Sequence, residues 1–271
     1  MTPSGRSLVE LASLRGRVAL VTGGAGHLGN VICDALAEAG AQVVIVDLDG
    51  QSAAAIAARI EDQHRVVALP LAVDLADESQ LRRVPPRVVE QFGRLDILVN
   101  CAALVGTSRL GGWTTPFEEQ SADTWRRALE INLTVPFILT QECAPALKAS
   151  GRGSVINIGS IYGIVGADLR LYDGTTMGSP AAYAASKGGL LQLTRWLSTV
   201  LAPSIRVNAV SIGGIKRGQP EPFIERYESR VPLARMATEE DIKGAIVYFA
   251  SDLSAYTTGQ NLTIDGGFTA W

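Results

Sequence analysis

The sequence predicts an α/β fold in which a single doubly wound parallel sheet of about seven strands carries helices on both faces. Short apolar runs alternate with longer amphipathic runs almost to the end of the 271 residues, and this order is typical of parallel strands joined by helical crossovers. The short runs are rich in Val, Ile and Leu on both sides, as expected of strands buried between two helix layers. A glycine-rich turn also joins the first strand-like run to the first helix-like run.

Each predicted element follows from this pattern. The predicted strands are 17–22, 42–47, 66–69, 95–99, 154–158, 205–210 and 262–265. The predicted helices are 28–39, 51–63, 77–92, 122–148, 181–201 and 239–251. Pro85 and Pro86 are expected to break or delay the third helix. Two stretches, 103–121 and 163–180, fit no regular element, and both follow strands, so we expect them to face the ligand crevice of the sheet.

Composition argues against several classes of function. The net charge of -3 gives no electrostatic case for binding nucleic acid or an anionic membrane, and no segment is long and apolar enough to span a bilayer. Three cysteines, Cys33, Cys101 and Cys143, form no CxxC pair, which favours core thiols and a cytoplasmic location. The only histidines are His27 and His64, so no metal site is expected.

The run RVALVTGGAGHLGN at 17–30 carries the most specific signal. A strand leads into a turn and a helix begins near Leu28; the glycines of the turn are Gly23, Gly24, Gly26 and Gly29. Glycine lets the backbone turn tightly and approach a ligand, and the free N–H groups of a helix N-terminus suit a pyrophosphate. Asp47 ends the next apolar run, where a carboxylate accepts hydrogen bonds from an adenosine ribose and repels a 2′-phosphate. These features predict a Rossmann-type domain that binds NAD.

The domain boundaries follow from the same motif. No internal repeat, low-complexity tract or linker divides the chain. We therefore predict a loose leader at 1–16, followed by one dinucleotide-binding and catalytic domain at 17–271. The leader lacks a continuous apolar stretch, so it does not resemble a signal peptide or an anchor.

Three polar side chains are candidates for chemistry. Tyr183 and Lys187 are four residues apart at the start of a predicted helix, which places both on one face. Ser160 ends a predicted strand at the same edge of the sheet. A phenol is a poor base near neutral pH, but a neighbouring ammonium and an oxidised nicotinamide both favour the phenolate. The trio therefore suits interconversion of an alcohol and a carbonyl compound.

Several motifs in order make the chain resemble the classical short-chain dehydrogenases/reductases from about residue 17 to 271. The matching segments are TGGAGHLG at 22–29, Asp47, Asp74 in AVDLAD, NCAA at 100–103, INLT at 131–134, Ser160, Tyr183-x-x-x-Lys187 and TGQNLTIDGG at 258–267. The resemblance implies that Tyr183 is the general acid/base, that Ser160 orients the substrate oxygen and that Lys187 holds the nicotinamide ribose. It also implies that Asn132 supports a water-linked proton relay.

The resemblance implies further contacts by position. Asp74 would bind the adenine, Asn100 would lie along the cofactor and Ile215 would meet the nicotinamide amide through its backbone. The implied cofactor-binding residues are Gly23, Gly26, His27, Leu28, Gly29, Asp47, Leu48, Asp74, Leu75, Asn100, Ala102, Tyr183, Lys187, Gly213 and Ile215. The chain departs from the family pattern at His27, Ala103, Ile212 and Arg217.

A narrower resemblance concerns the substrate. The segment between Ser160 and Tyr183 is longer than is common in the family, and with the tail at 212–223 it is similar to oxidoreductases of flagellin and surface-polysaccharide modification. This implies a sugar or sugar-nucleotide substrate, with Arg170, Tyr172, Lys216 and Arg217 as candidate substrate contacts. A 3-oxoacyl thioester reductase, another small-alcohol or polyol dehydrogenase, and a non-catalytic NAD-sensing protein remain alternatives.

Two expectations concern assembly and motion. The apolar stripes of helices 122–148 and 181–201, together with the family resemblance, predict a homo-oligomer, and a tetramer is expected. The tail GGFTAW is expected near a subunit contact. The segments 163–180 and 212–230 are expected to cover the nicotinamide end of the crevice, with 212–230 the more mobile because it has few apolar anchors.

Overall fold

One seven-stranded parallel sheet forms the centre of the molecule. The computed structural model describes residues 5–106, 108 and 110–271. The strands are β1 (Val18–Thr22), β2 (Gln42–Asp47), β3 (Ala68–Ala72), β4 (Ile97–Asn100), β5 (Gly153–Ser160), β6 (Ile205–Ile212) and β7 (Asn261–Ile264). Their order is β3-β2-β1-β4-β5-β6-β7, and every neighbouring pair is parallel. The predicted doubly wound sheet is confirmed, and its order reverses between β1 and β4, where such sheets bind ligands.

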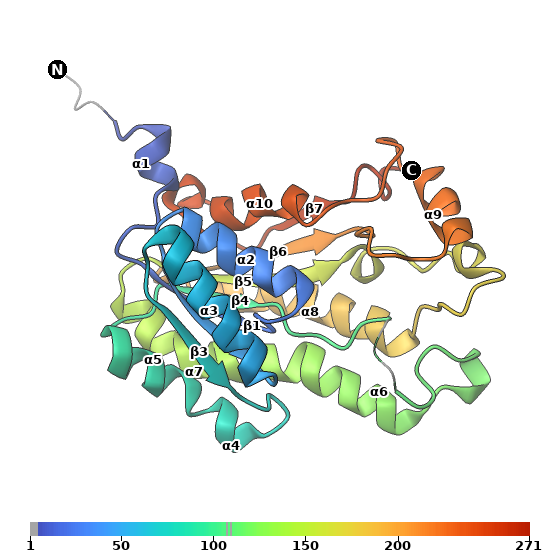
Figure 1. Ribbon diagram of the computed structural model, residues 1–271, viewed down its shortest axis with the longest axis horizontal. Coiled ribbons are helices and arrows are strands. Elements are labelled where there is room, and N and C mark those ends of the chain that lie inside the picture. The colour runs from blue at the N-terminus through green and yellow to red at the C-terminus, as the bar shows by residue number, and fades with distance from the viewer. Residues whose placement is uncertain (1–4, 107, 109) are drawn as a thin grey trace.

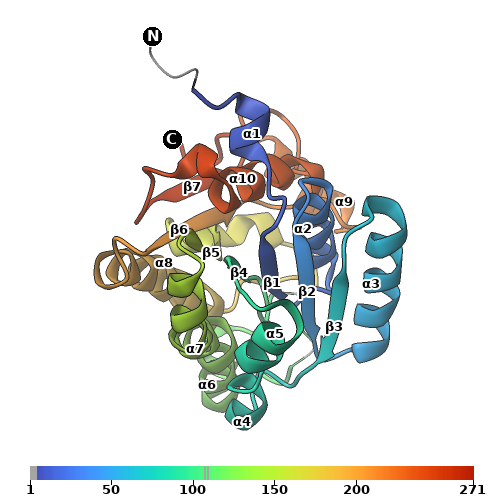
Figure 2. The same cartoon turned by 90° about the vertical axis from the view of Figure 1, so that its left-hand side faces the viewer.

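Helices cover both faces of this sheet (Figures 1 and 2). They are α1 (Leu8–Ala12), α2 (His27–Glu38), α3 (Gly50–His64), α4 (Glu78–Leu81), α5 (Val84–Phe92), α6 (Ala122–Leu129), α7 (Val135–Ala149), α8 (Ala181–Val200), α9 (Glu221–Glu228) and α10 (Glu240–Ala250). Residues of α2, α3 and α10 form one apolar core with the sheet. Residues of α5, α7 and α8 form a second core on the opposite face. The central strands are therefore buried on two sides, which explains their near-continuous apolar sequences.

Two predicted helices are interrupted. The predicted helix 77–92 is divided into α4 and α5, and Pro85 lies in the first turn of α5, where a proline without an N–H is tolerated. The predicted helix 122–148 contains a π-helical segment, Glu130–Thr134, between α6 and α7. Such wide turns are frequent at functional sites, and this one contains Asn132.

The prediction of a loose leader is wrong for the residues that the structure describes, while residues 1–4 lie outside them. Residues 8–12 form α1, and its Ser7 cap and Glu10 side chain bond reciprocally. Leu14 is fully buried and belongs to the core beneath α2. Burial of one leucine contributes about 1.5–3 kcal/mol, which accounts for the ordered path of this segment.

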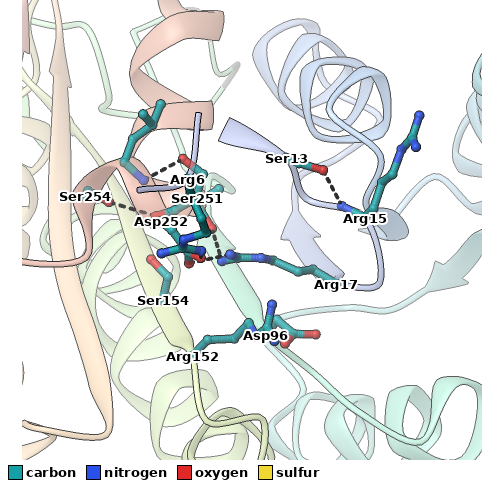
Figure 3. Close-up of polar contacts among 12 residues, drawn as sticks. Arg6, Ser13, Arg15, Arg17, Asp96, Arg152, Ser154, Ser251, Asp252 and Ser254 are labelled. Atoms are coloured by element: carbon teal, nitrogen blue, oxygen red, sulfur yellow. Dashed lines mark hydrogen bonds and ion pairs between the residues drawn. The ribbon is translucent and has the colours of Figure 1, made fainter. Parts of the chain in front are cut away.

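Charged contacts also attach the leader to the C-terminal part of the chain (Figure 3). Arg17 has a buried side chain that donates to the Ala250 carbonyl at 3.0 Å and to the Asp252 carboxylate at 2.5 Å. Arg6 forms an ion pair with the same carboxylate. The sequence pattern missed these contacts because the partners are more than 200 residues apart.

Two loop regions have more structure than their sequences suggested. The stretch 163–180 begins after a 3-10 turn at Ile161–Gly163 and contains a second at Leu169–Tyr172. The stretch 212–230 contains α9, in which Phe223, Ile224 and Tyr227 are buried. The expectation that 212–230 has few apolar anchors is therefore wrong. Among the described residues, no helix is long and apolar enough to cross a membrane.

Candidate active site

A cleft of about 600 Å³ opens at the carboxyl ends of β4, β5 and β6, beside the start of α2. Its lining contains both the residues predicted to carry the chemistry and residues from the end of the glycine-rich segment 17–30. Ser160, Tyr183 and Lys187 form one part of the lining, and His27 and Leu28 form another. Chain segments that are more than 100 residues apart in the sequence thus meet in one cavity, as the topology predicted.

The glycine-rich turn is shaped so that only glycine fits at two of its positions. Gly23 has φ of +65°, and a Cβ there would lie 2.8 Å from the Ala102 Cα. A Cβ on Gly29 would lie 2.0 Å from the Gly23 carbonyl oxygen. Gly26 is the N-cap of α2 and offers no side chain to the first N–H groups of the helix. These groups can therefore hold an anionic pyrophosphate, and the turn fits a dinucleotide.

The predicted adenosine-side residues lie at the same edge of the sheet. Asp47 ends β2, and its Oδ2 accepts a hydrogen bond from the Ala25 N–H at 2.9 Å. Leu48 follows it and is 73% exposed. Asp74 and Leu75 follow β3, which pairs with β2. These four side chains lie outside the lining of the cleft but along the edge from which it opens.

The three chemical side chains come from β5 and α8. Ser160 is the last residue of β5, and its Oγ accepts a hydrogen bond from the Tyr162 N–H at 3.2 Å. Tyr183 and Lys187 lie in the first two turns of α8. The Lys187 Nζ donates to the Ile158 carbonyl at 2.7 Å and lies 5.8 Å from the centre of the Tyr183 ring. The predicted convergence of this trio is what the structure shows.

Burial is the main cause that shifts the pKa values of Tyr183 and Lys187. Burial raises the pKa of Tyr183, and a hydrogen bond from Ser160 opposes that rise only in part. Burial lowers the pKa of Lys187 to about 8. The expected lowering of the Tyr183 pKa therefore does not come from the protein's own residues. In this environment the phenol keeps its proton at neutral pH and can donate it to a ketone oxygen.

Comparison with known proteins identifies the family. A family model described as enoyl-(acyl carrier protein) reductase matches residues 23–269. The chain is 38% identical over 260 residues to trans-4-hydroxycyclohexanecarboxylate dehydrogenase of Sinomonas cyclohexanicum, covering 94% of this chain and 93% of the relative. The chain belongs to the short-chain dehydrogenase/reductase family.

Solved structures of this family are similar over nearly the whole chain. A gluconate 5-dehydrogenase from Burkholderia cenocepacia, in complex with NADP and tartrate, has a TM-score of 0.87 at 29% identity and covers 98% of this chain and 100% of its own. A short-chain dehydrogenase from Leptospira borgpetersenii with bound NAD+ has a TM-score of 0.83 at 31% identity, covering 98% and 96%. The chain is thus an oxidoreductase that interconverts secondary alcohols and ketones.

Two asparagines that the family resemblance singled out have internal roles. Asn132 accepts the Leu104 N–H at 2.7 Å and donates to the Leu104 carbonyl and the Ser186 Oγ, both at 3.0 Å. It thereby joins the loop after β4 to α8. Asn100 donates to the Asn157 Oδ1 at 2.8 Å inside the sheet. The Asn100 side chain is therefore buried between β4 and β5, and its place along the cofactor stays a prediction.

The four residues at which the chain departs from the family pattern all lie at the cleft. His27, Ala103, Ile212 and Arg217 all contribute to its lining. Arg217 donates from Nε to the Glu239 carboxylate at 2.7 Å. Gly213 and Ile215 also line the cleft, and a Cβ on Gly213 would lie 2.9 Å from the Tyr227 hydroxyl. The segment after β6 therefore runs close under α9.

The structure separates the predicted substrate contacts into two groups. Tyr172 and Arg217 line the cleft. Arg170 and Lys216 are absent from its lining; Arg170 is paired with Asp168 at 2.9 Å, and the Lys216 Nζ lies 3.7 Å from Glu228. These two cations are mostly solvent-exposed, and an exposed pair contributes little binding energy.

Several lining residues were missed by the sequence reasoning. They are the bulky side chains Tyr162, Met177, Phe223, Tyr227 and Met236. The signal that could have found α9 was the apolar spacing of Phe223, Ile224 and Tyr227, which repeats at a helical interval. Tyr162 follows Ser160 by two residues, but only the 3-10 turn after β5 brings it to the cleft.

Proposed function

We propose that this oxidoreductase uses NAD(H) and exchanges a proton with its substrate through Tyr183. The observation that carries the proposal is one cleft lined by Ser160, Tyr183 and Lys187 together with the first residues of α2, which follow the glycine-rich turn. A bound nicotinamide supplies the hydride acceptor for alcohol oxidation or the hydride donor for ketone reduction. The protein's part is to place the substrate oxygen and to move its proton.

The proposed roles follow from the contacts. Tyr183 gives its proton to a ketone oxygen in reduction, and in oxidation its phenolate form takes the proton of the alcohol. Ser160 hydrogen-bonds the same oxygen, which fixes its position beside the phenol. Lys187 is held by the Ile158 carbonyl, and the remaining N–H groups of its ammonium can bind ribose hydroxyls. Once Tyr183 has given its proton to a ketone, the positive charge of Lys187 stabilises the phenolate that is left. Asn132 supports this arrangement by fixing α8 through Ser186.

Asp47 supports NAD as the proposed dinucleotide. Its carboxylate is held beside the glycine-rich turn by the Ala25 N–H, and an exposed leucine rather than a base follows it. A carboxylate accepts hydrogen bonds from both ribose hydroxyls, whereas it repels the 2′-phosphate of NADP. The solved relatives include both an NAD+ complex and an NADP complex. The proposal of NAD over NADP therefore rests on Asp47 and not on the relatives.

The proposed substrate is a small hydroxylated compound, such as a sugar or polyol. The resemblance to polysaccharide-modifying oxidoreductases supports a sugar, and the similar Sinomonas enzyme is named for a hydroxylated ring acid. A nucleotide-linked sugar would need cations for its phosphates, and of the four candidate contacts only Arg217 is a cation in the lining. A 3-oxoacyl thioester remains the alternative substrate.

We also propose a cytoplasmic homotetramer built from a single domain. The outer faces of the helices that follow β4 and β5 expose Trp125, Phe137 and Trp196, and large exposed apolar side chains often mark subunit contacts. Trp271 at the chain end is 81% exposed. Sedimentation at micromolar concentration should give four chain masses, and one chain mass would contradict this proposal.

A substrate panel tests the proposed function. The purified enzyme is incubated with NAD+ or NADP+ and with polyols, monosaccharides, cyclic alcohols, open-chain secondary alcohols and 3-hydroxyacyl thioesters, and reduced dinucleotide is followed by absorbance. The proposal predicts that a polyol, monosaccharide or cyclic alcohol is turned over faster than the 3-hydroxyacyl thioesters, and faster with NAD+ than with NADP+. Turnover of thioesters alone would favour the alternative, and no turnover of any alcohol with either dinucleotide would contradict the proposed function.

A further inference from the structure

The two segments that cover the cleft form one cap with its own apolar core. Side chains from 161–177 and from 223–236 pack together in a cluster separate from the two main cores. Tyr172 and Phe223 lie at its centre, with ring centroids 5.3 Å apart. Figure 1 shows α9 at the end of the sheet from which the cleft opens, beside the segment that follows β5.

Polar contacts join the same two segments. The Arg226 side chain on α9 donates to the Asp173 carbonyl at 2.5 Å. Arg230, just after α9, forms an ion pair with Asp168. Each contact crosses from one segment to the other, so the cap holds its aromatic side chains in a fixed arrangement over the cleft.

A pair of phenols forms part of the inner wall of this cap. The hydroxyl groups of Tyr162 and Tyr172 lie 2.7 Å apart, and both residues line the cleft together with Tyr183. Burial is the main cause that raises the pKa of both phenols, so each remains protonated at neutral pH. Each phenol has a single proton, and the hydrogen bond between them uses one of the two.

The Tyr172 hydroxyl also has a hydrogen bond with the Ser179 side chain. The three hydroxyl groups thus share two hydrogen bonds, and one O–H remains as a donor in the lining of the cleft. It lies in an aromatic wall, where a hydroxyl group without a hydrogen-bond partner is unfavourable. The wall beside it consists of the rings of Tyr172, Phe223 and Tyr227. Flat aromatic faces pack well against the C–H faces of a saturated ring. The wall therefore combines an apolar surface for a ring with a hydroxyl donor that is separate from Ser160 and Tyr183.

We propose that Tyr162 and Tyr172 are specificity-determining residues that select a cyclic alcohol carrying a second, uncharged hydroxyl group. The reacting hydroxyl lies at Tyr183, the ring packs on the aromatic wall and the second hydroxyl accepts from the phenol pair. This inference rests on the proposed function and narrows its substrate class to cyclic polyols and monosaccharide rings.

The test compares three probes that differ in one feature at a time. They are trans-cyclohexane-1,4-diol, which has a ring and a second hydroxyl; cyclohexanol, which has the ring alone; and 2-butanol, which has neither. kcat/KM with NAD+ is measured for each probe with the unmodified enzyme, Tyr162→Phe, Tyr172→Phe and the control Tyr256→Phe. Tyr256 is fully exposed and lies outside the cleft.

The expected result is a high ratio of kcat/KM for the diol over cyclohexanol in the unmodified enzyme and in Tyr256→Phe. Tyr172→Phe or Tyr162→Phe should lower this ratio about tenfold or more, because a buried donor is lost. Because both kcat/KM values come from the same variant, the ratio cancels any general loss of activity or of folded protein. Phe223→Leu should lower the ratio of cyclohexanol over 2-butanol, because it removes an aromatic face and keeps the diol contact.

Three outcomes would overturn the inference. They are a ratio that neither tyrosine variant changes, equal use of the diol and cyclohexanol by the unmodified enzyme, and turnover of 2-butanol without turnover of either ring compound. The last of these leaves the proposed function intact, since an open-chain secondary alcohol is still oxidised. Absence of turnover with every alcohol contradicts the proposed function as well.

Discussion

The Asp47 carboxylate accepts a hydrogen bond from the N–H of Ala25 at 2.9 Å, which ties the end of β2 to the glycine-rich turn after β1. Its other oxygen accepts the N–H of Asp49 at 3.2 Å. Both bonds fix the direction of the side chain at the edge of the sheet. The residue proposed to choose the dinucleotide is therefore also a support of the turn proposed to bind the pyrophosphate.

Replacing Asp47 should change the dinucleotide preference. The unmodified enzyme should prefer NAD+ over NADP+ by at least about tenfold in kcat/KM, since one unfavourable charge contact of roughly 1.4 kcal/mol gives that factor. The double variant Asp47→Ser/Leu48→Arg should relax or reverse the preference. Leu8→Arg is a matched control, because Leu8 is as exposed as Leu48 and lies on α1. Equal use of both dinucleotides by the unmodified enzyme would remove the basis of this prediction.

Two glycine-to-alanine variants should have opposite effects on stability. Gly29→Ala places a Cβ against the Gly23 carbonyl, and forcing atoms into a packed site costs about 1–3 kcal/mol or more. Gly244→Ala lies in α10, where a Cβ meets nothing within 4 Å, and should stabilise the helix by about 1 kcal/mol at most. Thermal unfolding checks both, and NADH binding should be lost only in Gly29→Ala. A stable, NADH-binding Gly29→Ala would contradict the geometry of the turn.

The buried ammonium of Lys187 should make stability depend on pH. Burial lowers its pKa from 10.5 to about 8, so between these values the unfolded chain binds more protons than the folded chain and stability rises with pH. Lys187→Met removes this pH dependence. The free energy of unfolding of Lys187→Met, minus that of the unmodified enzyme, should therefore fall by on the order of 3 kcal/mol from pH 8 to pH 10.5. Lys148→Met, at an exposed position, should show no such trend in urea unfolding. A constant difference across this pH range would mean that Lys187 is not desolvated.

Arg217 should be the one predicted substrate cation that affects substrate binding. It lines the cleft, whereas Arg170 and Lys216 do not. Arg217→Ala should raise KM for trans-4-hydroxycyclohexanecarboxylate about tenfold, the factor that corresponds to a charge contact of roughly 1.4 kcal/mol, and should change KM for cyclohexane-1,4-diol less. Arg170→Ala and Lys216→Ala should stay within about 0.5 kcal/mol, as is usual for surface changes. Equal changes in KM for all three variants would contradict the prediction that Arg217 alone contacts the substrate.

The sheet and the convergence of Ser160, Tyr183 and Lys187 could be predicted from the sequence, because both depend on local patterns. The apolar runs of β1 and β5 specify buried strands, and the spacing of Tyr183 and Lys187 specifies one helix face. The order of the strands then brings Ser160 to the same edge. These inferences use only periodicity and chain order.

The cap and the leader could not be predicted in this way, because their stability comes from contacts between distant segments. Arg17 reaches Asp252, and Arg230 reaches Asp168; neither partner has a signal in the neighbouring sequence. The direction of the Asn100 side chain could not be predicted for a related reason. Its motif position was informative, but the direction of its side chain depends on Asn157 in the next strand.

The measurement that tests the central claim most directly is turnover and NADH binding by Tyr183→Phe. The phenylalanine keeps the ring that packs in the cleft and removes only the hydroxyl that exchanges the proton. Turnover should fall by about 10² or more, the usual scale for a positioned proton donor or acceptor. NADH affinity, measured by fluorescence titration, should stay within about twofold of the unmodified enzyme, a change of under 0.5 kcal/mol. Near-normal turnover by a variant that binds NADH would contradict the account of Tyr183 as the proton-exchanging group.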